Sequence, residues 1–267
     1  MISSFYLISI LLVLSYSVTS VSYWLMFSKE QTESAMRSRI LLFISLGLHS
    51  ALIILIALMN KRYPFGTPGE SLLVCAWMIG IAHVTSEFFA KSKPLGVFTL
   101  VPITVGVFFS ILTIDPYTAI SEEYLGSFFS FHIISSLTAY ACFTIASILS
   151  CMYILLFKKL KSKQFDVFFR LLPPLENIEL LMSIWVYFGI FFMILSPLIG
   201  RVWVIQNGAE SGFSPKVLGI FVVLFLFIIA SLGRTFSNFK GLRFAIFILV
   251  GFILLFLTQV LQIHGFN

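Results

Sequence analysis

Four histidines are the residues of this chain best suited to chemistry, because imidazole is the commonest metal ligand among side chains and titrates near neutral pH. They are His49, His83, His132 and His264. The chain around them is almost wholly apolar, with a mean hydropathy of +1.05, 59% hydrophobic residues and only 10% charged residues. Four imidazoles in such surroundings suggest ligands for a flat, metal-containing cofactor.

The elements that must position these histidines are predicted from eight apolar runs. A helix of about 20 apolar residues spans a hydrocarbon core of about 30 Å. None of the runs alternates between polar and apolar residues as a membrane barrel does, so helices are predicted. The runs cover residues 4–27, 39–59, 70–90, 95–114, 128–157, 177–200, 215–233 and 242–264. The sequence therefore predicts an all-α, polytopic membrane protein, a bundle of about eight transmembrane helices that forms one domain over residues 1–267.

The basic residues predict how the bundle is oriented. The first, third, fifth and seventh connections contain 13 lysines and arginines, and the even connections contain four. Because cytoplasmic connections collect Lys and Arg, we expect both termini outside a bacterial-type cytoplasmic (inner) membrane. The first run lacks a positive n-region and exceeds the roughly 7–15 residues of a signal-peptide h-region, so a retained helix is expected. The net charge of +6 reflects this topology and does not indicate nucleic acid as a partner.

The rise of a helix converts sequence offsets into depth. His49 lies ten residues after a cytoplasmic arginine and His83 eight residues before a cytoplasmic lysine. At about 1.5 Å per residue, both lie roughly 12–15 Å from the inner face, near the middle of the bilayer. His132 and His264 lie at least one membrane thickness from the cytoplasmic basic residues. These two are therefore expected at the outer interface.

Each histidine has a second interpretation. Ionisable groups in a bilayer are costly, so a functional role is one hypothesis for His49 and His83. The other is a neutral imidazole that hydrogen-bonds a neighbouring helix. Glu87 lies on the same helix face as His83. It either fixes the tautomer of a ligating ring or, as we expect, extends to the cytoplasmic edge and has no role as a partner of that ring. Position alone also leaves an ordinary interfacial role open for His132 and His264.

No hydrolytic constellation is apparent in the sequence. It lacks G-x-S-x-G, C-x-x-C and C-x-x-C-H, and no carboxylate pair is placed with a histidine at the outer face. Cys75, Cys142 and Cys151 lie inside predicted spans, where buried structural thiols are expected. An enzyme is therefore less expected than a binding protein, although the question stays open.

Three stretches of the chain together resemble the cytochrome c assembly protein family, the CcsA-, CcmC- and HemX-like membrane proteins that handle haem. They are Phe131-His132 with Ser135-Ser136 and Ala139-Tyr140-Ala141; a basic tract leading into Leu172-Pro173-Pro174-Leu175-Glu176; and Gly200-Arg201-Val202-Trp203 followed by Ser214-Pro215-Lys216 and a Gly-Leu-Arg turn. Two further stretches resemble the HemX-like branch, namely His49-Ser50 and Glu70-Ser71-Leu72-Leu73 with Trp77. The similarity covers most of residues 40–265.

The chain departs from the family pattern in two places. Members that assemble cytochromes carry an external segment with several tryptophans followed by Asp-Pro-Lys, whereas here only Trp203 precedes this position and Ser214 replaces the aspartate. Ser214 still suits a helix start as its N-cap, with proline in the first turn. Many members also hold a histidine near the cytoplasmic end of that helix, where this chain has Ser231-Leu232-Gly233.

The resemblance implies a set of cofactor-binding residues. His132 and His264 would be the axial ligands of the iron in a non-covalently bound haem b at the outer face. Trp203 would lie against the cofactor, and His49 and His83 are further candidates for cofactor binding. The implied partners are haem, apocytochrome c, assembly subunits and the lipid bilayer.

The implied function is c-type cytochrome biogenesis, in which the protein holds or passes haem at the outer membrane face. One alternative is the HemX-like role of a membrane regulator of tetrapyrrole (haem) biosynthesis. An alternative of another class is a small-solute transporter, in which Pro102 and Pro197 break helices and His49 and His83 line a path.

Overall fold

The structure of the chain is a computed structural model that describes residues 2–30, 35–90, 95–116, 126–163, 167–206, 215–236 and 239–265. Within these ranges the regular secondary structure is helical, and eight helices are long and apolar enough to cross a membrane. The helices are α1 (Ile2–Ser28), α2 (Ala35–Asn60), α3 (Pro68–Ala90), α4 (Gly96–Thr113), α5 (Ser127–Lys161), the short α6 (Val167–Leu171), α7 (Leu175–Gln206), α8 (Pro215–Phe236) and α9 (Leu242–Gly265). The predicted all-α, polytopic membrane bundle is confirmed.

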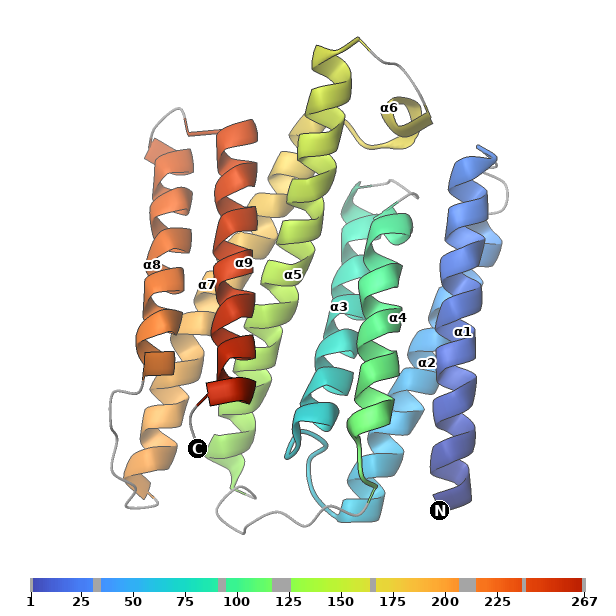
Figure 1. The fold of residues 1–267 in the computed structure, drawn as a ribbon, viewed down its shortest axis with the longest axis vertical. Helices are drawn as coiled ribbons and strands as arrows, with labels where there is room; N and C mark the ends of the chain where they lie inside the picture. Colours follow the sequence, from blue (N-terminus) through green and yellow to red (C-terminus); the bar gives the residue numbers. More distant parts are fainter. Residues whose placement is uncertain are drawn as a thin grey trace.

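The long helices run alternately up and down, so α1 starts and α9 finishes toward the same end of the bundle (Figure 1). We call this end, which also holds the connection between α2 and α3, the terminal end. The short helix α6 lies at the opposite end, near the last turns of α5. The terminal end is therefore the one that the basic residues predict to lie outside.

The bundle has two halves, α1–α4 and α5 with α7–α9 (Figure 1). In the first half α1 packs on α2 and α4, and α3 packs on α4. In the second half α5 packs along α7 and α9, and α8 packs on α9. The halves meet where α3 lies against α5, and the Trp185 indole of α7 donates a hydrogen bond to Ser86 Oγ of α3 at 2.7 Å.

Hydroxyl pairs join the helices of the first half. Ser15 Oγ lies 2.6 Å from Ser45 Oγ and Ser22 Oγ lies 2.8 Å from Ser38 Oγ, both between α1 and α2. A similar pair joins α1 to α4. Lipid tails are as apolar as leucine, so close packing of small residues and hydrogen bonds between helices hold such a bundle together.

Two stacked rings fill the centre of the second half. The rings of Phe143 and Phe227 lie 4.0 Å apart and nearly parallel, at 8°. Glycines make room on both sides, because a Cβ at Gly189 would lie 2.7 Å from the Phe143 ring and a Cβ at Gly251 would lie 2.9 Å from the Phe227 ring. Helices α5, α7, α8 and α9 therefore converge on one aromatic layer.

The boundary between α6 and α7 agrees with the position of prolines in the sequence. Helix α6 finishes at Leu171 and α7 begins at Leu175, on either side of Pro173-Pro174, because the residue before a proline is biased away from the helical conformation. Ser214, the expected N-cap of α8, lies outside the described residues. Helices α4 and α7 continue through Pro102 and Pro197, so the helix breaks expected for a transporter are not found there.

Candidate functional site

A cavity of about 630 Å³ lies at the terminal end of the second half. Helices α5, α7 and α8 form most of its walls, Gln259 of α9 reaches into it, and the segment before α3 closes one side. Its lining is mostly apolar, and its polar groups include His132, Ser136, Tyr140 and Ser196. This volume and this mixture are typical of small-molecule and cofactor sites, which occupy about 300–1,000 Å³.

The ring of His132 is oriented by helix α7. Its Nδ1 lies 2.8 Å from the carbonyl oxygen of Ser196 and 3.0 Å from Ser196 Oγ. A carbonyl only accepts, so Nδ1 carries the proton and donates it, and the lone pair of the neutral ring is on Nε2. Ser136 Oγ completes the contact between the helices by bonding to Ser196 Oγ. The ring therefore has the tautomer of a metal ligand that binds through Nε2.

The last part of α7 is shaped to accept this ring. A Cβ at Gly200 would lie 2.8 Å from His132 Nδ1 and 3.1 Å from its Cε1, so only glycine leaves the ring in place. Pro197 lines the cavity and has no N–H to donate to the carbonyl of Met193, which also lines it. Glycine and proline one turn apart thus form the wall behind the imidazole.

The deeper end of the cavity is closed by a link between α5 and α9. Gln259 Nε2 donates a hydrogen bond to the hydroxyl oxygen of Tyr140 at 2.7 Å. Tyr140 lies three residues before Phe143, and the cavity-lining Leu224 lies three residues before Phe227. The stacked aromatic layer of the second half therefore supports the floor of the cavity.

Trp203 and His264 lie toward the same end of the bundle as the cavity. The Trp203 ring is 5.3 Å from the ring of Phe129, which lines the cavity. The tryptophan therefore packs behind a lining residue of the cavity. His264 falls in the last turn of α9, five residues after Gln259, but its side chain lies outside the described residues. The pairing of His132 with His264 stays a prediction.

His49 lies in the first half, and both of its ring nitrogens have partners. Nδ1 is 3.0 Å from the hydroxyl of Tyr16 on α1, and Nε2 is 3.0 Å from the carbonyl of Leu73 on α3. Nε2 therefore donates to Leu73, and the Tyr16 hydroxyl donates to Nδ1. This fully buried ring links three helices, which fits the interhelical interpretation.

His83 also lies in the first half and is fully buried. Its Nδ1 is 2.8 Å from Thr99 Oγ1, and Thr99 donates its own proton to the carbonyl of Leu95. Nδ1 therefore donates to Thr99, and Nε2 has no hydrogen-bond partner among the described residues. His83 is not among the residues that line the cavity.

Glu87 does not extend to the cytoplasmic edge as expected. Its side chain is buried, Tyr23 donates a hydrogen bond to Oε2 at 3.3 Å, and Arg39 Nε lies 3.4 Å from the same oxygen. The guanidinium reaches inward from a partly exposed position and offsets the buried charge. A carboxylate that finds such a partner does not need to leave the bundle.

The thiols and carboxylates offer no alternative metal site within the ranges that the structure describes. No group of three or more His, Cys, Asp or Glu there is arranged to hold a metal ion. Cys142 is buried, Cys75 and Cys151 are half-buried, and all three are free thiols.

Sequence reasoning missed several residues of the cavity. Ser196 and Gln259 were not singled out, and Gly200 was noted only as part of a motif. The segment 62–68 was not connected with the site at all. A sequence signal did exist there, since Thr67-Pro68-Gly69-Glu70 has the pattern of a capped helix start with proline in the first turn.

Comparison with known sequences agrees with the earlier resemblance. A sequence model of the family described as "Cytochrome C assembly protein" matches residues 66–261, well over half of the chain. The chain belongs to the cytochrome c assembly protein family. The matched range contains His132 and all of α5, α7 and α8, and it finishes three residues before His264.

Two curated relatives are both named "Protein HemX". The one from Brevibacillus brevis is 25% identical over 164 residues, which are 61% of this chain and 60% of that protein. The one from Bacillus subtilis (strain 168) is 23% identical over 220 residues, which are 79% of this chain and 78% of that protein. The chain thus aligns with less than two thirds of the first relative. Family and relatives together indicate a haem-related membrane protein.

Proposed function

We propose that the chain binds haem in the cavity at the terminal end, with His132 as an axial ligand. The hydrogen bond from His132 Nδ1 to the Ser196 carbonyl, inside a mostly apolar cavity of about 630 Å³, carries this proposal. Metal-ligating histidines almost always donate their other ring N–H to such an acceptor. Nε2 would then supply the lone pair for iron, and the apolar walls would cover the porphyrin. Bound haem would supply an iron whose redox poise depends on its axial ligands and surroundings.

His264 is our proposal for the second axial ligand. It lies in α9, the helix that contributes Gln259 to the cavity. Two axial imidazoles would join α5 to α9 through the iron. Trp203 would support the edge of the cofactor through Phe129.

The cellular role that we propose is c-type cytochrome biogenesis. Family membership supports it, and the basic residues predict that the cavity opens on the outer side of the membrane. The chain would hold or pass non-covalent haem b there, together with assembly partners and apocytochrome c.

The first experiment is the visible spectrum of the purified protein after reconstitution with haem. The wild type should give the spectrum of a six-coordinate, bis-imidazole haem. The changes His132→Ala and His264→Ala should each remove that signature, and free imidazole should restore it in the His132→Ala protein. His83→Asn, which keeps a donor for Thr99, should match the wild type. A bis-imidazole spectrum that survives His132→Ala would contradict the proposal.

A second candidate role is regulation of tetrapyrrole biosynthesis, as the HemX-like resemblance implies. Both curated relatives carry that name, and only one tryptophan stands where cytochrome-assembling members have several. Deleting the gene and measuring covalent c-type cytochrome against total haem separates the two roles. Loss of c-type cytochrome alone supports assembly, whereas a change in total haem and in an early enzyme of the pathway supports regulation.

A further inference from the structure

The segment between α2 and α3, residues 62–68, brings the first half of the bundle to the cavity of the second half. Phe65, Gly66, Thr67 and Pro68 line the cavity. Phe65 is buried in a small apolar cluster with Val74 of α3 and Leu137 of α5, separate from the main core. We call residues 62–68 the wall segment. Phe65 thus packs against Leu137, a residue of α5 that also lines the cavity.

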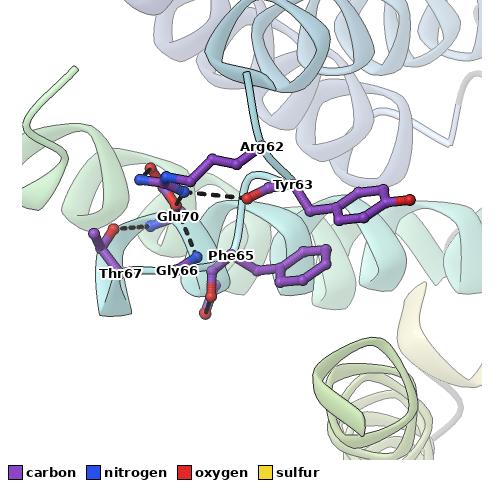
Figure 2. Close-up of polar contacts among 7 residues, drawn as sticks. Arg62, Tyr63, Phe65, Gly66, Thr67 and Glu70 are labelled. Atoms are coloured by element: carbon purple, nitrogen blue, oxygen red, sulfur yellow. Dashed lines mark hydrogen bonds and ion pairs between the residues drawn. The ribbon is translucent and has the colours of Figure 1, made fainter. Parts of the chain in front are cut away.

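A buried ion pair spans this segment. Arg62 Nη1 lies 2.6 Å from Glu70 Oε2 and Arg62 Nη2 lies 2.8 Å from Glu70 Oε1, so the planar guanidinium faces the carboxylate with two parallel hydrogen bonds. The Arg62 side chain is 5% exposed and the Glu70 side chain is 0% exposed. Figure 2 shows the two groups face to face, with the rings of Tyr63 and Phe65 extending away from them.

Further hydrogen bonds attach the backbone of the wall segment to the same pair. The Gly66 N–H donates to Glu70 Oε2 at 2.9 Å, and Arg62 Nη1 donates to the carbonyl of Tyr63 at 3.1 Å (Figure 2). The Glu70 N–H donates to Thr67 Oγ1 at 3.2 Å, which caps the start of α3. Glu70 is thus the point where the first turn of α3, the arginine and the wall segment are joined.

Stability alone does not account for this arrangement. Desolvating two charges costs about as much as their attraction returns, and apolar residues of the same size often stabilise a protein as well. What the pair does supply is one defined geometry, because a bidentate contact fixes both distance and orientation. The atoms whose positions it fixes are those that support Phe65 at the cavity.

We propose that Arg62 and Glu70 are positioning residues of the cavity, which hold the wall segment so that Phe65 covers Leu137 and retains the bound ligand. The proposal rests on the proposed function for the nature of that ligand, a porphyrin. It adds that the first half of the bundle, although it contributes no proposed axial ligand, controls retention. It does so through the buried carboxylate of Glu70.

A thiol at the covered position tests the proposal without any ligand. The reporter carries Leu137→Cys with Cys75→Ala and Cys142→Ala, and it keeps Cys151 of the same helix as an internal reference. The rate of N-ethylmaleimide labelling at each thiol is followed by mass spectrometry in nanodiscs. Glu70→Gln should raise the rate at residue 137 by at least about tenfold, equivalent to about 1.4 kcal/mol, and leave the rate at Cys151 unchanged.

Two further variants separate positioning from folding. Glu30→Gln is the matched control, because it removes the carboxylate of an exposed Arg170–Glu30 pair at the opposite end and should change neither rate. Arg62→Met combined with Glu70→Gln leaves no buried unpaired charge and should fold, yet it should still show the faster labelling at residue 137. Unchanged labelling in this folded double variant would overturn the proposal, and so would equal acceleration at both thiols.

A second experiment, with bound haem, connects this result with the proposed function. It distinguishes failure of the positioning role from failure of the proposed function. Transfer of haem to excess apomyoglobin should be at least about tenfold faster from the double variant than from the wild type. If the wild type binds no haem, the proposed function fails while the labelling result still decides the positioning role. If haem binds through His132 but labelling and transfer are unchanged, the positioning role fails alone.

Discussion

At the scale of single residues, the His132 ring can occupy its position because residue 200 of α7 is a glycine and has no Cβ. The Cβ of any other residue at position 200 would lie 2.8 Å from Nδ1 of this ring. The Ser196 carbonyl then fixes the direction of the Nδ1 proton. The addition of one methyl group at residue 200 therefore acts on the His132 imidazole without removing any polar group.

We predict that Gly200→Ala weakens haem binding by about 10–100-fold, the range measured when the outer support of a metal ligand is lost. The added Cβ displaces the imidazole from the Ser196 carbonyl. Titration of the purified variant with haem, followed by absorbance, measures the effect. Gly47→Ala is the control, since nothing lies within 4 Å of a Cβ at that position. Equal affinities for the two variants would contradict the geometry described for His132.

We predict that Tyr16→Phe destabilises the first half of the bundle by about 1 kcal/mol, because it removes the hydroxyl that donates to His49 Nδ1 and leaves a buried acceptor unsatisfied. The midpoint of thermal unfolding in a fixed detergent measures the loss. Tyr6→Phe is the same chemical change on a side chain that is 55% exposed, and it should leave the midpoint unchanged. A midpoint for Tyr16→Phe equal to the control would mean that this hydrogen bond contributes no stability.

The sequence predicted the position of His132 along its helix but not its environment. Depth depends only on the helical rise, so counting residues from the basic ends was enough. The partner of the ring is 64 residues away along the chain, and many serines in the spans were equally plausible partners. Glu87 shows the same limit, since its pairing with Tyr23 and Arg39 requires knowledge of which helices are neighbours.

At the scale of elements, the glycines of α7 and α9 determine how closely the helices of the second half approach. Phe143 and Phe227 stack at 4.0 Å between Gly189 and Gly251. The cavity lies between this layer and the terminal end, bounded by residues about one turn from the stacked rings. Its shape therefore depends on the packing of the aromatic layer.

We predict opposite effects for the same substitution at two helical glycines. Gly189→Ala places a Cβ 2.7 Å from the Phe143 ring and should destabilise the protein by about 1–3 kcal/mol through overpacking. Gly47→Ala meets no atom within 4 Å and should be neutral or stabilising by up to about 1 kcal/mol, because alanine favours a helix. The thermal unfolding midpoints of both variants in one detergent test this prediction. A lower midpoint for Gly47→Ala than for the wild type would contradict it.

The existence of each long helix was predictable, because an uninterrupted apolar run in lipid has no economical alternative to a helix. The residues at which these helices end were harder to predict. Helix α5 reaches Lys161 and α7 reaches Gln206, beyond the apolar runs that finish at residues 157 and 200. The residues that extend α5 past 157 are mostly lysines, which can continue a helix once it leaves the hydrocarbon, whereas those that extend α7 past 200 are mostly apolar and follow Arg201. The short α6 was not predicted because its five residues are far fewer than a membrane span requires.

At the scale of the whole molecule, the alternating helices bring the start of α1, the finish of α9 and the cavity to one end (Figure 1). The excess of basic residues in the odd connections predicts that this end faces away from the cytoplasm. The side of the membrane that the cavity faces follows from this orientation. The sequence could predict the orientation but not the cavity, because the cavity is made by two halves that meet at α3 and α5.

We predict that alkaline phosphatase fused after the last residue of the chain is active, whereas a fusion after Ser162 is inactive. The enzyme requires the oxidising outer compartment for its disulfides, and the basic residues predict these two points on opposite sides. Green fluorescent protein at the same points should give the reverse pattern. An active fusion after Ser162 would place the cavity on the cytoplasmic side and remove the proposed role in cytochrome assembly at the outer face.

The two Arg–Glu pairs that were compared above also differ in how dissolved ions affect them. Arg170 and Glu30 are 58% and 39% exposed, so raising the ionic strength, which shortens the Debye length from about 8 Å at 0.15 M to about 3 Å at 1 M, screens their attraction. Arg62 and Glu70 lie out of reach of solvent ions. High salt on the side of the membrane that holds Arg170 and Glu30 would therefore weaken the contact between α6 and the turn after α1, and the same salt at the terminal end would leave the wall segment in place.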